Sequence, residues 1–187
     1  KIQAAIGDHI REYLKSLDFI EFHSPKILAV ATEGGAEVFK LNYFGREATL
    51  AQSAQFYKQM MVASLERVFE FGATYRAEPS ITSRHMSEFI TVDAEMGFID
   101  GLEDIMALLD GLMNCVIDKV WETNRKELEA LKATKPRLTK KLPVVTMQKL
   151  HELYLKETGN DSRNEKDPTP AEEKFICEYS AQHWKSE

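Results

Sequence analysis

The amino-acid sequence predicts an α+β fold in which an antiparallel sheet is flanked by helices. Three observations support this prediction. Apolar residues recur at helical spacing through residues 2–17 and again through residues 102–124. Between these segments, residues 68–75 and 89–98 are rich in β-prone residues and lie on either side of a polar loop, residues 77–86. The two strands should therefore pair as a long antiparallel hairpin, and the mixed order of elements is typical of α+β proteins.

The N-terminal third should contain one helix, one strand and a short hairpin. Residues 2–17 form the amphipathic helix, whose apolar stripe includes Ile2, Ile6, Ile10 and Leu14. Residues 19–23 are strand formers, and Pro25 ends the strand because it lacks the N–H group that a ladder needs. A glycine-rich loop follows at residues 32–36. The segments 38–44 and 47–50 then flank Gly45 as a hairpin.

The remaining elements are mostly helical. Residues 52–64 lack glycine and proline and suit a helix, and residues 102–124 carry the longest helical pattern. Residues 132–141 hold five cations around Pro136, which we interpret as a solvated connection in preference to a nucleic-acid surface. We expect a short strand running into a helix at residues 144–155 and a polar loop at 158–168. Thr169, Pro170 and Glu172 then form the start signal of a final helix that runs toward Trp184.

Composition excludes several classes of protein. The 187 residues carry 24 Lys and Arg against 30 Asp and Glu, so the formal net charge is −6, which argues against a protein that mainly coats nucleic acid. The two cysteines, Cys115 and Cys177, have neither the number nor the spacing of a disulfide framework or a zinc site. No apolar run approaches the ~20 residues of a membrane span, so we expect no membrane partner.

Charged residues gather on the second hairpin and its loop. Because side chains alternate along a strand, Arg76 and Glu78 should share one face, and so should Asp93 and Glu95. Two interpretations fit this pattern. The first is a solvated sheet surface with cross-strand ion pairs. The second is a phosphate and nucleotide site, because arginine forks match phosphate oxygens and Phe89 could stack on a purine.

The amino-acid sequence of this hairpin resembles motif 2 of the class II aminoacyl-tRNA synthetases. Within this class it is most similar to the motif 2 of aspartyl-tRNA synthetases of archaeal and eukaryotic type. The similarity covers Arg76-Ala77-Glu78, the loop, Arg84-His85-Met86-Ser87-Glu88-Phe89 and Asp93-Ala94-Glu95. Three further segments resemble family motifs in the same order: Phe22-His23-Ser24-Pro25-Lys26 resembles motif 1, Thr32-Glu33-Gly34-Gly35-Ala36 the amino-acid flipping loop, and Gln52-Ser53-Ala54-Gln55 the Gln-Ser-Pro-Gln helix start.

The resemblance implies a ligase that activates aspartate with ATP and transfers it to tRNA(Asp). The matched positions imply that Arg76 is the catalytic residue, because it would hold the α-phosphate and stabilise the charge that develops there. Glu78 would meet the adenine amino group, Phe89 would stack on its ring, and Arg84 with His85 would engage the γ-phosphate. Mg²⁺ normally accompanies ATP in such chemistry, although no residue is expected to be a metal ligand.

The resemblance also implies an aspartate site. Lys58 would face the side-chain carboxylate of the substrate, so an uncharged amide would leave a buried ammonium unpaired and asparagine is the weaker substrate choice. The alternative for Lys58 is an exposed helix lysine. The substrate ammonium would lie near Ser53 and Gln55, with Glu33 and Asp93 supplying negative charge. Ala54 departs from the family's proline, which we expect to change only the entry into the helix.

The similarity is incomplete in its C-terminal part. Motif 3, which carries a second ATP-binding arginine, has no counterpart between Leu102 and Glu187. We therefore expect residues 1–187 to be an N-terminal part of a catalytic domain, inactive alone, with the motifs in residues 1–100 and a helical connecting region in residues 101–187.

The resemblance further implies a cytoplasmic homodimer that pairs through motif 1. The alternative is that the apolar stripe of residues 2–17 packs only within its own chain. Two other functions stay open: a paralogue that makes asparagine from activated aspartate, and a truncated, non-catalytic homologue used for dimerisation or RNA binding.

Overall fold

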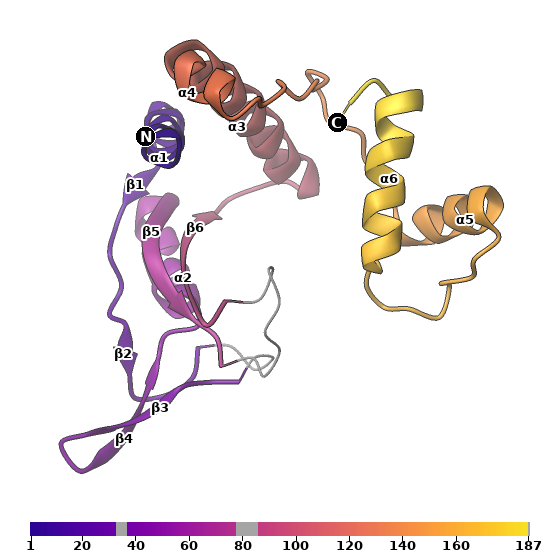
Figure 1. Ribbon diagram of the computed structural model, residues 1–187. Coiled ribbons are helices and arrows are strands. Elements are labelled where there is room, and N and C mark those ends of the chain that lie inside the picture. The colour runs from indigo at the N-terminus through magenta and orange to yellow at the C-terminus, as the bar shows by residue number, and fades with distance from the viewer. Residues whose placement is uncertain (33–36, 78–85, 187) are drawn as a thin grey trace. The chain divides into compact units, whose positions relative to one another are not determined.

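The computed structural model describes residues 1–32, 37–77 and 86–186 (Figure 1). The chain forms two compact units. The first, here called the sheet unit, consists of residues 11–105, and the second, the helical unit, consists of residues 1–10 and 106–187. Helix α1, Ile2–Ser16, contributes its first part to the helical unit and its last part to the sheet unit. The division of the chain into catalytic subregions at residue 100 stays a prediction.

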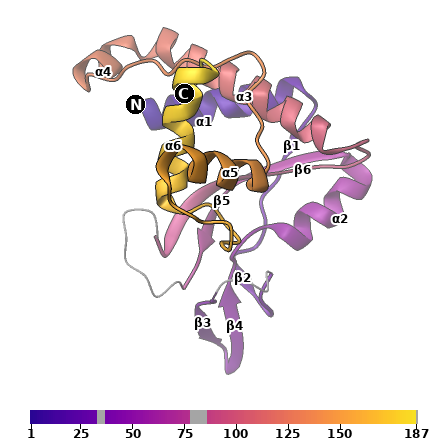
Figure 2. The same ribbon diagram turned by 90° about the vertical axis from the view of Figure 1, so that its right-hand side faces the viewer.

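The sheet unit contains two three-stranded sheets and one helix. One sheet has the order β1-β5-β6 and the other β2-β4-β3. Helix α2 lies beside the β5–β6 ribbon, and the β3–β4 hairpin extends away from it (Figure 2). The elements are β1 Ile20–Glu21, β2 Ile27–Leu28, β3 Lys40–Tyr43, β4 Arg46–Leu50, α2 Gln55–Leu65, β5 Arg67–Tyr75 and β6 Glu88–Met96.

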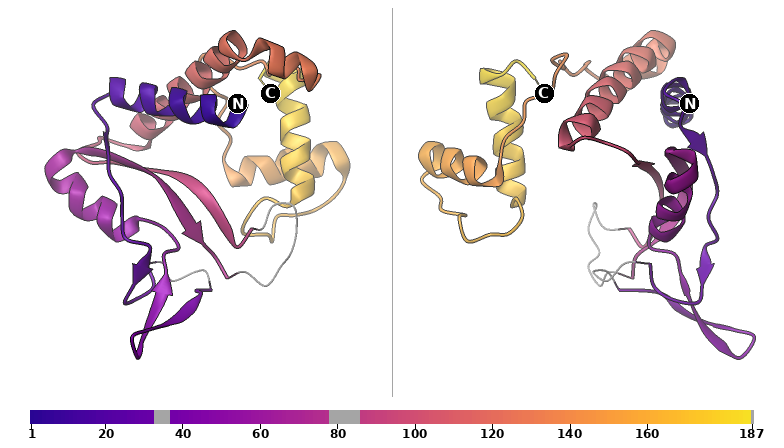
Figure 3. Two further views of the ribbon diagram at one scale, coloured as in Figure 1. Left: turned by 60° about the vertical axis from the view of Figure 1, so that its left-hand side comes forward. Right: turned by 180° about the vertical axis from the view of Figure 1, so that it is seen from behind.

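The antiparallel hairpin of β5 and β6 confirms the main prediction of fold class. Its two strands pair in unbroken register from Arg67 with Met96 to Tyr75 with Glu88, and the long ribbon is visible from two sides in Figure 3. One feature differs from the expected purely antiparallel sheet, because β1 pairs with β5 in parallel. The core on the α2 side joins Phe22, Ala54 and Val68, with Tyr57 and Met61 packed against them.

The helical unit is built around α3, Leu102–Thr123, which confirms the longest predicted helix. Its apolar cluster joins Val116 and Val120 to Leu128, and Ile2 and Ile10 of α1 pack against this cluster. The other helices are α4 Arg125–Ala130, α5 Met147–Thr158 and α6 Pro170–His183.

Three local predictions were wrong or incomplete. Helix α2 begins at Gln55 and not at residue 52, because Ser53 accepts a hydrogen bond from the Gln55 N–H through its hydroxyl, at 3.2 Å, outside the helical ladder. The expected strand before α5 does not form, because residues 144–145 have no strand pairing there and Thr146 caps α5. Helix α4 and strand β2 were not predicted at all.

Candidate active site

One face of the β5–β6 ribbon carries the charged residues of the candidate site. The register pairs Glu70 with Asp93 and Val68 with Glu95, so Glu70, Asp93 and Glu95 lie on the same face. Arg76 follows β5 on this face, and its N–H donates a hydrogen bond of 3.0 Å to the Ser87 carbonyl. The predicted sharing of one face by Asp93 and Glu95 is therefore confirmed. Thr74, near the Arg76 end of the strand, lies four positions after Glu70, which corresponds to ~13 Å along the strand.

Lys58 is buried on this face and bound to carboxylates. It lies in α2 with 5 % of its surface exposed, so it is not the exposed helix lysine of the alternative interpretation. Its ammonium forms an ion pair with the Asp93 carboxylate and lies 3.3 Å from Glu95 Oε2. Asp93 also accepts a hydrogen bond of 3.4 Å from the Ala54 N–H. One cation and two carboxylates thus form a cluster with a net charge of −1, here called the Lys58 cluster.

The turn that leads into α2 brings Ser53 and Gln55 close to the Lys58 cluster in sequence and in structure. The Ser53 hydroxyl accepts from the Gln55 N–H, and the Ser53 carbonyl accepts from the Thr32 hydroxyl at 3.4 Å. Ala54 is 2 % exposed and packs in the core, and the helix forms with alanine in the family's proline position. The structure therefore places Ser53 and Gln55 at the helix entry, next to the residue whose N–H contacts Asp93.

Arg76 and Phe89 lie together at the other end of the face. The Arg76 guanidinium carbon is 5.9 Å from the centroid of the Phe89 ring, and Phe89 is half-buried opposite Thr74. A planar cation beside an aromatic face offers a stacking surface and a phosphate-binding fork side by side. The remaining predicted residues, Glu33, Glu78, Arg84 and His85, lie outside the described residues.

Sequence reasoning missed a buried polar network beside the Lys58 cluster. Glu70 is 2 % exposed, and its carboxylate accepts hydrogen bonds from the Ser24 N–H at 2.7 Å and from the Ser24 hydroxyl at 2.8 Å. Lys26 Nζ lies 2.9 Å from the same carboxylate. The available signal was a lone carboxylate within the apolar run Val68-Phe69-Glu70-Phe71. A buried charge in such a run needs a partner, which the loop after β1 supplies.

This network shifts the ionisation of Glu70 and restricts its neighbour. Burial raises the pKa of the Glu70 carboxyl, but the hydrogen bonds from Ser24 and the charge of Lys26 outweigh burial, so its pKa lies below the ordinary value. A side chain at Gly72 would place its Cβ 2.8 Å from both the Glu70 carboxyl carbon and Lys26 Nζ. Glycine is therefore needed where this ion pair crosses the strand.

A second buried polar cluster lies in the helical unit and has the residue types of a catalytic triad. His151 Nδ1 lies 3.1 Å from the Ser162 hydroxyl and 2.6 Å from Glu172 Oε1, and the Ser162 hydroxyl also bonds to Glu172. In a nucleophilic triad the serine and the acid contact different ring nitrogens. Here both contact Nδ1, so the cluster fixes the loop before α6 and does not activate Ser162.

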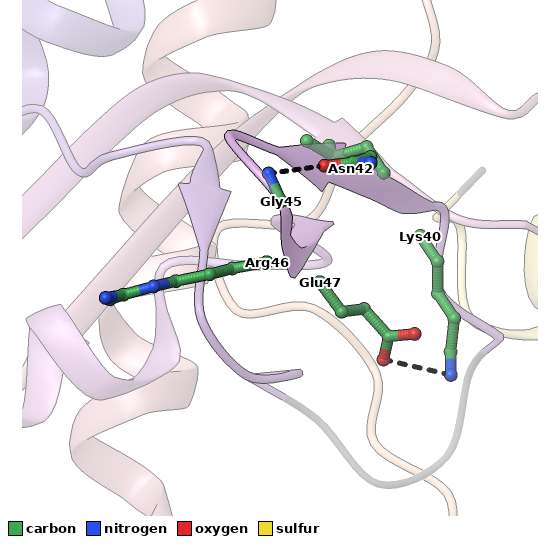
Figure 4. Close-up of a pocket in the computed structure, with 6 residues that line it drawn as sticks. Lys40, Asn42, Gly45, Arg46 and Glu47 are labelled. Carbon is green, nitrogen blue, oxygen red and sulfur yellow. Dashed lines mark hydrogen bonds and ion pairs between the residues drawn. The ribbon is translucent and has the colours of Figure 1, made fainter.

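Two cavities of the described chain are lined by residues outside the Lys58 cluster. One, of about 290 Å³, lies on the β3–β4 hairpin and is lined by residues 40–42 and 45–47 (Figure 4). There Lys40 pairs with Glu47 at 3.1 Å, and the Asn42 side chain accepts from the Gly45 N–H at 2.8 Å. The other, of about 450 Å³, lies beside α3. Neither wall includes Arg76 or Lys58.

Within the described ranges, His, Cys, Asp and Glu do not gather in groups of three that could hold a metal ion. Among the same residues, no helix combines the length and the apolar character that crossing a membrane requires.

Comparison with protein families identifies the fold. A family model described as tRNA synthetases class II (D, K and N) matches residues 1–186. The chain belongs to the class II tRNA synthetases. This membership confirms the resemblance to the class II synthetases and the α+β fold class, and the assignment of the β5–β6 ribbon and Arg76 to motif 2 stays a prediction.

Relatives with curated names include several aspartate–tRNA ligases. The chain is 40% identical over 182 residues to an aspartate–tRNA(Asp/Asn) ligase of Deinococcus radiodurans, covering 97% of this chain and 42% of the relative. It is 47% identical over 177 residues to the enzyme of the same name from Methanopyrus kandleri, covering 94% and 41%. The chain therefore spans about two-fifths of the length of these synthetases.

Solved structures of class II synthetases share the fold. An asparaginyl-tRNA synthetase from Pyrococcus horikoshii complexed with asparaginyl-adenylate superimposes with a TM-score of 0.84 at 29% identity, over 95% of this chain and 41% of that one. An aspartyl-tRNA synthetase from Entamoeba histolytica gives a TM-score of 0.79 at 27% identity, over 99% and 35%.

Proposed function

We propose that this chain carries the aspartate-binding half and part of the ATP-binding half of an aspartate–tRNA ligase. The complete enzyme would join aspartate and ATP into aspartyl-adenylate, with release of pyrophosphate, and then pass the aspartyl group to tRNA(Asp). The curated relatives support this assignment through their names and their 40% and 47% identity. The observation that carries the proposal is the buried Lys58 cluster, because its charges match an acidic amino acid.

The Lys58 cluster suits aspartate through an exchange of ionic partners. Without substrate, the Lys58 ammonium is neutralised by Asp93 and Glu95. Aspartate would bring a side-chain carboxylate to Lys58 and an ammonium group to Asp93, so each protein charge keeps an opposite charge. Asparagine would supply the ammonium group but no side-chain carboxylate. A buried ammonium left with a weaker partner loses about 2–5 kcal/mol, which gives the site its preference.

Arg76 and Phe89 fit the ATP half of the site. The half-buried Phe89 ring would stack on adenine, and the Arg76 guanidinium beside it would bind the α-phosphate. When aspartate attacks that phosphate, Arg76 would stabilise the charge that develops on the phosphate oxygens without itself reacting. Glu78, Arg84 and His85 would complete the contacts to adenine and to the γ-phosphate. Mg²⁺ would arrive with ATP and shield the phosphate charges.

Reciprocal variants test this division of roles. Calorimetric titration of the chain with aspartate should show that Lys58→Met weakens aspartate binding by about 10-fold or more and leaves ATP binding unchanged, because a charge-assisted contact contributes about 1.5–3 kcal/mol. Arg76→Ala should weaken ATP binding by a similar factor and leave aspartate binding unchanged.

Lys40→Met and Arg46→Ala on the β3–β4 hairpin are matched controls, because each removes an exposed cation from the same unit. Both controls should bind aspartate and ATP like the unaltered chain. Binding of asparagine as tightly as aspartate would contradict the role of Lys58, and absence of aspartate and ATP binding in the unaltered chain would contradict the proposal itself.

The complete enzyme would also attach aspartate to a second tRNA, tRNA(Asn). Both relatives described above are named for tRNA(Asp) and tRNA(Asn) together. Charging of tRNA(Asn) transcript with aspartate by the complete enzyme would establish the wider specificity. The relatives do not favour the asparagine-forming paralogue, and aspartate binding at the Lys58 cluster would exclude a purely structural homologue.

We also propose that the complete enzyme acts in the cytoplasm as a homodimer that pairs through motif 1. Ile6 and Ile20, in the motif 1 segment, are 37% and 45% exposed, which leaves apolar surface for a second copy. Ile2 and Ile10 are already used within their own chain, so the dimer surface would be narrower than the full stripe of α1.

A further inference from the structure

The segment Lys132–Lys141 reverses the charge of the chain locally. It contains five Lys and Arg residues and no Asp or Glu, whereas the whole chain has a formal net charge of −6. The five cations are Lys132, Lys135, Arg137, Lys140 and Lys141, and all five are exposed. We call this segment the basic strap. A run of like charges of this density is unfavourable in isolation and attracts a polyanion.

The basic strap is exposed, as the sequence predicts for a solvated connection, but it is also attached to α3. The Asn114 side chain of α3 donates a hydrogen bond of 3.3 Å to the Thr139 carbonyl, and Asp110 of α3 accepts one of 2.9 Å from the Leu142 N–H. Lys135 Nζ lies 2.6 Å from Asp118 Oδ1, also on α3. Three attachments to one helix fix the path of the strap, which reduces the conformational entropy that binding would remove.

The fixed path leaves three lysines available to a ligand. Lys132, Lys140 and Lys141 have no ion-pair partner among the described residues, and they flank the part of the strap that is attached to α3. Between them, residues 135–138 and α3 enclose the cavity of about 450 Å³. Three exposed lysines spread over a ten-residue segment fit a chain of repeated negative charges better than a single small anion.

We propose that the basic strap binds the phosphate backbone of RNA. The inference rests on the proposed function for the choice of tRNA as that RNA. The strap holds no aromatic residue on which a base could stack, so its contacts orient the RNA without reading its sequence. A membrane surface fits less well, because the strap is extended and α4 before it has only six residues, too short for an amphipathic anchor.

The salt dependence of RNA binding tests the proposal. The chain is titrated into labelled tRNA(Asp) transcript, and separately into an unrelated duplex hairpin, over a series of salt concentrations. Replacing Lys132, Lys140 and Lys141 together by glutamine should weaken binding of both RNAs about 10-fold or more at low salt, and should reduce the slope of log K against log salt by about 2–3, because three phosphate contacts are lost.

A second triple variant separates the strap from the general effect of charge. Lys166, Lys174 and Lys185 are exposed lysines of the same unit, and replacing them by glutamine removes the same charge. This control should keep the slope and affinity of the unaltered chain, and circular dichroism should show that both variants fold.

Equal losses in the two triple variants would overturn the proposal, as would a chain that binds neither RNA at low salt. Loss of binding to vesicles of anionic lipid, with RNA binding intact, would assign the strap to a membrane surface instead. Aspartate and ATP titrations on the same variants keep this outcome distinct from the proposed function, because the residues proposed for both small ligands belong to the sheet unit and the strap belongs to the helical unit.

Discussion

At the scale of single residues, the charged face of the β5–β6 ribbon is stabilised because each of its three buried or half-buried carboxylates contacts a lysine. Glu70 and Asp93 are directly opposite in the register, and two like charges at that spacing repel each other. Lys26 neutralises Glu70, and Lys58 neutralises Asp93 together with Glu95. The proposed amino-acid site therefore lies next to a fixed ion pair between Glu70 and Lys26, whose charges are already neutralised by each other.

Glu70→Gln should destabilise the sheet unit, because it leaves Lys26 without its carboxylate and weakens the bonds to Ser24. We expect a loss of about 1–3 kcal/mol in the free energy of unfolding at pH 7, measured by urea denaturation. Because the folded-state pKa of Glu70 is lowered, its stabilisation is present above the unfolded pKa of ~4.3 and disappears as the pH falls through the folded value. The difference between variant and unaltered chain should therefore shrink below about pH 4.

The control for Glu70→Gln is Glu47→Gln, which breaks the exposed pair with Lys40. An exposed pair contributes little, so this change should alter the free energy of unfolding by less than about 0.5 kcal/mol at pH 7. Equal effects of the two substitutions, or a Glu70→Gln effect that persists unchanged at acid pH, would show that the Glu70 network does not act as an ion pair.

At the scale of elements, sequence patterns predicted the long helices, the cap of α6 and the main hairpin, which depend on near neighbours, although the short helix α4 was missed. The capping box before α6 is present as expected, since Thr169 and Glu172 exchange hydrogen bonds over one turn. The long β5–β6 hairpin was predicted because β-prone residues lie on both sides of its polar loop. Strand β2 and the parallel pairing of β1 with β5 were not predicted, because each depends on a partner far away in sequence.

The same limit applies to the candidate site. The alternation of β6 places Asp93 and Glu95 on one face, which the sequence predicts. The Glu70–Ser24–Lys26 network could not be predicted, because it forms only after β1 has paired with β5 and brought the loop of residue 24 beside Glu70. Local rules specify which side chains share a strand face, but not which distant loop covers that face.

Thr169→Ala tests the start of α6. The Thr169 hydroxyl accepts from the Glu172 N–H at 3.3 Å, and Glu172 accepts from the Thr169 N–H at 3.0 Å. Burial raises the pKa of Glu172, but hydrogen bonds from Ser162, Thr169 and His151 outweigh it and lower this pKa to about 2. Because the cap also positions Glu172 against His151, the substitution should cost about 1–2 kcal/mol in chemical denaturation.

Two comparisons make this prediction specific. Thr169→Ser keeps the hydroxyl and should stay within about 0.5 kcal/mol of the unaltered chain. Thr146→Ala removes the corresponding cap of α5, which contacts only the Lys149 N–H at 3.2 Å, and should cost less than Thr169→Ala. A larger loss at Thr146 than at Thr169 would contradict the coupling of the α6 cap to the His151 cluster.

At the scale of the whole molecule, helix α1 packs the N-terminal residues of the chain against α3 and α4, which lie more than 100 residues later in the sequence. Its first residues belong to the helical unit, where Ile2 and Ile10 pack against Val116, Val120 and Leu128, and Lys1 pairs with Glu127 at 2.9 Å. Its apolar stripe therefore has a use within one chain. The proposed homodimer would instead use motif 1 to pair two chains, and the two uses differ in their dependence on protein concentration.

Replacing Ile2 and Ile10 together by alanine should lower the thermal midpoint at every protein concentration, because half-buried side chains leave the cluster around Val120. The expected loss is about 2–4 kcal/mol in total. Ile6→Ala is the matched change on the exposed part of the stripe, and it should leave the midpoint of dilute protein unchanged while weakening self-association in sedimentation or light scattering. If the Ile2/Ile10 variant melts like the unaltered chain in dilute solution and differs only when concentrated, these residues contact a second copy and not the helical unit.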